Sequence, residues 1–192
     1  MAPMNTEELA DLDFTKRAPT PTPTPAPAAR REAAALQPDV EIGSLREGQA
    51  GNFISYARAG GARAQAAADA PIIVVEDDEV TRRVLERALT LSGYPVRVAA
   101  DSREFLQLMK KPPLPRLILL DVELPQVNGF KILSLLRQHP QTSAIPLVML
   151  TGRSENKDLL HALSLGADGY LSKPVTLATL RSTLDRLLRR AA

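Results

Sequence analysis

The chain has 192 residues with 24 basic and 22 acidic side chains, a net charge of +2, and this near-balance argues against nucleic acid as a partner. It has no cysteine and two histidines, which excludes a disulfide scaffold, a thiolate metal site, a cysteine nucleophile and a multi-histidine metal site. No apolar run approaches the roughly 18–20 residues of a membrane span, and the first dozen residues lack an apolar signal segment, so we expect a cytoplasmic protein without membrane insertion.

The chain divides near residue 70 into a part poor in apolar residues and a part rich in them. Ile, Leu, Val, Met and Phe account for 11 of residues 1–70 and for 44 of residues 71–192. The first part therefore has too little apolar surface to offset chain entropy, and we expect a largely disordered, low-complexity extension. Five alternating prolines over residues 19–27 predict an extended spacer within it. A short apolar cluster at residues 9–14 fits either a docking peptide or a stray feature of such a tail.

From residue 71 onward, short apolar strands alternate with helical patterns. The strands are expected at 72–75, 96–98, 117–120, 146–150 and 170–172. The helices are expected at 79–92, 102–109, 129–138, 155–164 and 176–190. Because these strands are continuously apolar, we expect a five-stranded parallel α/β sheet that is covered by helices on both faces.

Two local details follow from the same spacing. The first helix is expected from the helical spacing of its apolar residues, Val80, Val84, Leu85, Ala88 and Leu91. Ser102 stands where the second helix begins and is expected to be its N-cap.

Polar side chains follow four of the five strands. They are Glu76, Asp77 and Asp78 after the first strand, Asp121 after the third, Thr151 after the fourth and Lys173 after the fifth. In open parallel sheets the reactive site lies beyond the carboxyl ends of the strands. Acids gathered there repel one another unless a cation lies among them, and oxygen ligands suit Mg²⁺. A carboxylate beside Mg²⁺, a lysine and a hydroxyl is well suited to phosphoryl transfer.

Four segments lie at these strand ends. In sequence order they are IIVVEDDE, LILLDVELPQVNGF, VMLTGR and GADGYLSKPV. Together they resemble the receiver domain of the response regulators of two-component signalling, over about residues 72–188. The resemblance implies a receiver domain at residues 71–192 with the flavodoxin-like fold, in which the strand order is 2-1-3-4-5.

The resemblance also implies a role for each acid. Asp121 would be the phosphoacceptor and a ligand of Mg²⁺. Asp77 would bind Mg²⁺ directly, Glu76 would act mainly through water, and the backbone carbonyl of Glu123 would supply a further oxygen. Asp78 competes with Asp77 if the motif is shifted by one residue, but we place it outside the site, because Asp78 or Glu79 is expected to start the first helix and to favour its dipole.

The remaining family positions are Lys173, Thr151 and Tyr170. Lys173 would pair with Asp121 at rest and with the phosphoryl group after transfer, and its bond to Pro174 would be cis. Thr151 would hydrogen-bond a phosphoryl oxygen. Tyr170 would be the switch aromatic that moves inward with Thr151, and its alternative is an ordinary half-buried strand tyrosine.

The function implied is that of a single-receiver response regulator. A histidine kinase or phosphotransfer protein would phosphorylate it, and the face made by the fourth helix, fifth strand and fifth helix would then bind a downstream protein or a second copy. It would catalyse only its own phosphorylation and dephosphorylation. Two rivals are a phosphate-independent receiver-like adaptor and a Mg²⁺-dependent phosphohydrolase with Glu123 as its acid–base.

Overall fold

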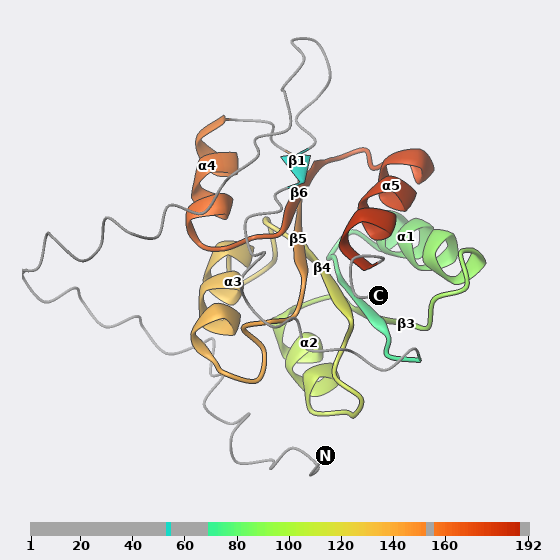
Figure 1. The fold of residues 1–192 in the computed structure, drawn as a ribbon, viewed down its shortest axis with the longest axis horizontal. Coiled ribbons are helices and arrows are strands. Elements are labelled where there is room, and N and C mark those ends of the chain that lie inside the picture. Colours follow the sequence, from blue (N-terminus) through green and yellow to red (C-terminus); the bar gives the residue numbers. More distant parts are fainter. Residues whose placement is uncertain (1–52, 55–68, 153–155, 189–192) are drawn as a thin grey trace, which may run out of the picture.

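A computed structural model of the chain describes residues 53–54, 69–152 and 156–188. In these ranges the protein is an open twisted sheet with helices on both faces (Figure 1). The predicted proline spacer at 19–27 and the apolar cluster at 9–14 lie outside the described residues. No helix in the described ranges combines the length and the apolar character that crossing a membrane requires.

The five predicted strands all form and are mutually parallel. They are β2 (Ile72–Val75), β3 (Val96–Ala99), β4 (Leu117–Asp121), β5 (Leu147–Thr151) and β6 (Gly169–Ser172). Their spatial order is β3-β2-β4-β5-β6, which confirms the predicted order 2-1-3-4-5. Four of them, all except β3, are buried at every residue, as the continuous apolar pattern predicted.

A sixth strand is added to the five predicted parallel strands. β1 (Phe53–Ile54) pairs antiparallel with β6 at the edge of the sheet, although residues 1–70 were expected to be a largely disordered extension. The sequence did not reveal this strand because two residues are too few for an alternating pattern. Backbone pairing with an existing edge supplies what the local sequence lacks.

The helices form two layers around two apolar cores. On one face lie α1 (Glu79–Leu91) and α5 (Leu177–Leu188), which pack on side chains such as Val74 and Leu119. On the other face lie α2 (Ser102–Met109), α3 (Gly129–Gln138) and α4 (Asn156–Ser164). The two layers cover the sheet and leave its carboxyl edge to the loops.

Only some of the apolar residues of α1 are buried. Leu85 and Leu89 are buried against the sheet, whereas Val80, Val84 and Leu91 are 71%, 57% and 68% exposed. The helix carries two apolar stripes, and both have helical spacing. Packing buries the stripe of Leu85 and Leu89 and leaves the other in solvent.

Aspartates cap the first two helices, and the second cap corrects the prediction. Asp78 caps α1, since its carboxylate accepts a hydrogen bond of 2.8 Å from the backbone N–H of Thr81. Asp101, not Ser102, caps α2, because its carboxylate accepts from the N–H groups of Arg103 and Glu104. Ser102 is instead the first helical residue and is buried. An aspartate and a serine are comparable N-caps, so the sequence alone could not choose between neighbours.

Candidate functional site

The sheet register brings the predicted site residues to one edge. Val75 pairs with Leu120, so Glu76 and Asp121 follow at the same level of neighbouring strands. Thr151 pairs with Ser172, and Lys173 comes next in the chain. Because all five strands are parallel, their carboxyl ends meet here, as predicted from the strand-end residues.

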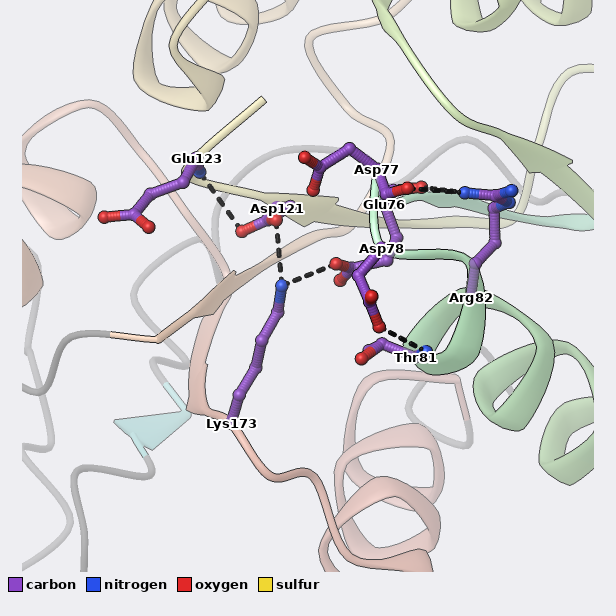
Figure 2. A network of polar contacts seen from close by, with 8 residues as sticks. All are labelled: Glu76, Asp77, Asp78, Thr81, Arg82, Asp121, Glu123 and Lys173. Carbon is purple, nitrogen blue, oxygen red and sulfur yellow. Dashed lines mark hydrogen bonds and ion pairs between the residues drawn. The ribbon is translucent and has the colours of Figure 1, made fainter. Parts of the chain in front are cut away.

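Lys173 joins the two buried acids of this edge (Figure 2). Its ammonium donates hydrogen bonds of 2.7 Å to Glu76 Oε1 and 2.8 Å to Asp121 Oδ2. The side chains of Glu76 and Asp121 are 0% and 2% exposed, and that of Lys173 is 22% exposed. The predicted pairing of Lys173 with Asp121 is therefore present, and Glu76 shares the same cation. The Lys173–Pro174 bond is cis, as the resemblance implied.

Burial and charge act against each other in this cluster. Desolvation by burial raises the pKa of Glu76 above its ordinary value of 4.5, with the charge of Asp121 adding to it and Lys173 opposing it. Burial alone would lower the pKa of Lys173, but its hydrogen bonds to Asp121 and Glu76 outweigh burial and raise that pKa above 10.5. The lysine is therefore a fixed positive charge at the edge of the sheet.

Three carboxylates are placed to hold a cation. One oxygen each from Glu76, Asp77 and Asp121 lies within 4.8 Å of the other two, and Asp77 is the exposed member. Glu76 Oε2 is buried and has no hydrogen-bond partner among the described residues. A buried carboxylate oxygen without a donor is costly, and a water held by a cation would supply that donor. These residues fit a hard divalent ion such as Mg²⁺.

The loop after β4 fixes the other oxygen of Asp121. Asp121 Oδ1 accepts a 3.1 Å hydrogen bond from the backbone N–H of Glu123 (Figure 2). Farther along, the N–H of Gly129 donates to the carbonyl of Val122, so the start of α3 presses on the end of β4. A Cβ at Gly129 would overlap the backbone carbonyl of Asp121, which explains a glycine at this close approach.

Sequence reasoning missed Arg82, which supports the acidic turn from α1. Its Nη1 donates to the backbone carbonyls of Glu76 at 2.8 Å and Asp77 at 3.0 Å (Figure 2). The guanidinium thus fixes the backbone from which both acids project. An arginine in the first turn of a helix gives no such signal in sequence, because most are simply solvated.

Thr151 and Tyr170 are both buried beside the site, at 1% exposure each. Tyr170 pairs with Met149, two residues before Thr151, so Thr151 and Tyr170 project from the same face of the sheet. That face carries α3 and α4. The tyrosine is therefore fully buried and not half-buried, and its role as the switch aromatic stays a prediction.

One known protein family matches most of the described chain. A family model described as "Response regulator receiver domain" matches residues 72–185. The match begins at β2 and ends within α5, so it contains every residue of the candidate site and excludes β1.

Relatives and solved structures agree with this match. The transcriptional regulatory protein GltR of Pseudomonas aeruginosa is 37% identical over 120 residues, which are 62% of this chain and 49% of that protein. AfsQ1 of Streptomyces coelicolor, also a transcriptional regulatory protein, is 36% identical over 119 residues, 62% of this chain and 51% of that protein. The chain thus spans about half the length of the curated relatives it matches.

Among solved structures, the chemotaxis protein CheY4 of Vibrio cholerae is similar with a TM-score of 0.59 and 33% identity, covering 63% of this chain and 100% of that one. A response regulator from Chloroflexus aurantiacus has the same TM-score and 34% identity, covering 63% of this chain and 98% of its own.

Proposed function

Because the chain belongs to the family of response regulator receiver domains, we propose that Asp121 accepts a phosphoryl group from a histidine kinase or a phosphotransfer protein. The observation that carries the proposal is the bridge from Lys173 to Asp121 and Glu76 at 2.7–2.8 Å. It places one positive charge beside a buried carboxylate at the carboxyl edge of a parallel sheet, where transferred charge needs compensation.

In the proposed reaction, a carboxylate oxygen of Asp121 attacks phosphorus and the bond from phosphorus to the donor nitrogen breaks. The ammonium of Lys173 offsets charge on the phosphoryl oxygens, and the N–H of Glu123 holds the carboxylate in place. Asp77 and Asp121 would hold Mg²⁺ directly, Glu76 through water, and the backbone carbonyl of Glu123 would complete the set. When bound, the ion supplies further positive charge to the phosphoryl oxygens.

The proposed switch runs from Thr151 to Tyr170. Thr151 ends β5 on the face that also buries Tyr170, so a hydroxyl drawn toward a phosphoryl oxygen would change the space available to the ring. The change would shift the population of conformations of α4, β6 and α5, and so alter what that face binds. A downstream protein or a phosphorylation-dependent dimer would read it.

The exposed stripe of α1 supports docking of a phosphodonor protein. Val80 and Val84 lie one turn apart and directly follow the acidic turn that carries Asp77. Leu177, at the start of α5, is also 51% exposed and follows Lys173 by four residues. An apolar surface beside the acceptor fits a helical partner that presents its own phosphoryl group at close range.

The proposed activity is confined to the chain's own phosphorylation and dephosphorylation. The test is incubation with acetyl phosphate and Mg²⁺, followed by intact-mass measurement. We expect one phosphoryl group on the native protein and on Asp185→Asn, an exposed control, and none on Asp121→Asn. Phosphorylation of Asp121→Asn would move the acceptor elsewhere. An unmodified native protein would favour the phosphate-independent adaptor.

A further inference from the structure

β1 occupies an edge that the receiver fold by itself would leave open. Phe53 is in register with Tyr170, and Ile54 is in register with Gly169. Without β1, β6 would be the edge strand of the described sheet, with a row of backbone N–H and C=O groups that face no strand. Figure 1 shows β1 beside β6.

The pairing is antiparallel, whereas every other pair in the sheet is parallel. β1 is therefore an added strand and not another strand–helix unit of the fold. Its residues also lie outside the stretch 72–185 that matches the receiver family. Strand addition of this kind uses main-chain hydrogen bonds for affinity, so it does not require a long or apolar segment.

The chain is long enough to place β1 on its own sheet. Fourteen residues, 55–68, separate Ile54 from the first described residue of the domain, Asp69. Fully extended, they would span up to about 46–50 Å. A domain of this size has a radius of gyration of roughly 13–14 Å, so the segment can reach β6 in the same molecule.

We propose that the edge of β6 is a strand-accepting surface whose occupant is this chain's own segment at Phe53–Ile54. The edge admits one strand, so this segment excludes any other extended partner, including the β6 edge of a second copy. Its register places it on the backbone of Tyr170. Any effect of β1 on signalling would act through Tyr170 and therefore rests on the proposed switch role of that residue. The occupancy of the edge by β1 does not rest on it.

The first experiment measures amide exchange of the full chain without a phosphodonor. The double substitution Phe53→Pro/Ile54→Pro removes both strand donors, and Ala59→Pro, outside β1, is the control. We expect exchange in residues 169–172 to become about tenfold faster in the double variant only, with β4 unchanged. Equal exchange in β6 of the native protein and the double variant would overturn the proposal.

The second experiment asks whether the edge accepts the segment in trans. A labelled peptide of residues 49–58 is titrated into the native chain and into the double proline variant. We expect binding at least about tenfold tighter to the variant, because its edge is open. Equal binding to both would overturn the proposal.

A dimer would also overturn it. If light scattering shows a dimer and the exchange protection of β6 is lost on dilution, the occupant of the edge is a second copy. Neither readout depends on whether Asp121 is phosphorylated.

Discussion

Replacing Lys173 by methionine tests the electrostatics of the site. The substitution keeps an unbranched side chain of similar length but removes the cation between Glu76 and Asp121. Each ion pair, at 2.7 Å and 2.8 Å, has an attraction of about 6 kcal/mol at an effective dielectric constant of about 20. Desolvation offsets part of this, and removing one partner of a buried pair costs about 3–5 kcal/mol. Because Lys173 is partly exposed, we expect a loss near 3 kcal/mol at pH 7.5.

The loss should depend on pH through Glu76. Burial already raises the pKa of Glu76, and removing Lys173 takes away the interactions that lower it. A carboxyl whose folded-state pKa lies above its unfolded value binds a proton more tightly when folded. The destabilisation is therefore largest above the raised pKa and is relieved as the pH falls through it toward 4.5. Urea unfolding at pH 7.5 and pH 5, without Mg²⁺, measures this.

Mg²⁺ provides an independent check of the same reasoning. An ion that binds only the folded state adds about 2.7 kcal/mol of stability when its concentration is 100 times its dissociation constant. Mg²⁺ should therefore bring Lys173→Met back toward the stability of the native protein without Mg²⁺. Lys110→Met, at an exposed position after α2, is the control and should change little. A loss of stability in Lys173→Met that is identical at pH 5 and pH 7.5 would refute the role assigned to buried Glu76.

Three further substitutions test the scaffold. Asp168→Ala should cost about 3–5 kcal/mol in urea unfolding, because the buried Asp168 accepts 2.8 Å and 2.9 Å hydrogen bonds from the partly buried Arg137 and from the N–H of Leu147. An unchanged midpoint would contradict this. Gly129→Ala should cost about 1–3 kcal/mol and slow phosphorylation, because its Cβ overlaps the carbonyl of Asp121; native stability and rate together would show that the loop yields freely. Asp78→Ala should lower the thermal midpoint at pH 7. The hydrogen bond from the Thr81 N–H lowers the pKa of Asp78 below its ordinary 3.8, so its stabilising contribution is present above that pH and is lost as the pH falls, and a difference that persists at pH 2 would exclude the cap as its origin.

The sequence by itself determined the strands, their parallel arrangement and the residues at their carboxyl ends. Continuous apolar runs require burial on both faces, and this constraint is local enough to read without a structure. The positions of Glu76, Asp77, Asp121 and Thr151 followed from where each run stops. The start of α1 at Asp78 or Glu79 also followed from the sequence, because capping depends on neighbours three residues away, and the structure places the cap at Asp78.

Tertiary structure decided the features that depend on distant contacts. On α1, the stripe of Val80 and Val84 and the stripe of Leu85 and Leu89 both have helical spacing. Only packing against the sheet selects the second stripe for burial. Lys173 is 97 residues from Glu76 in sequence, so their shared ion pair appears only when the strands align. β1 has no sequence signature, because its partner is the backbone of β6 and backbone groups are the same in every residue.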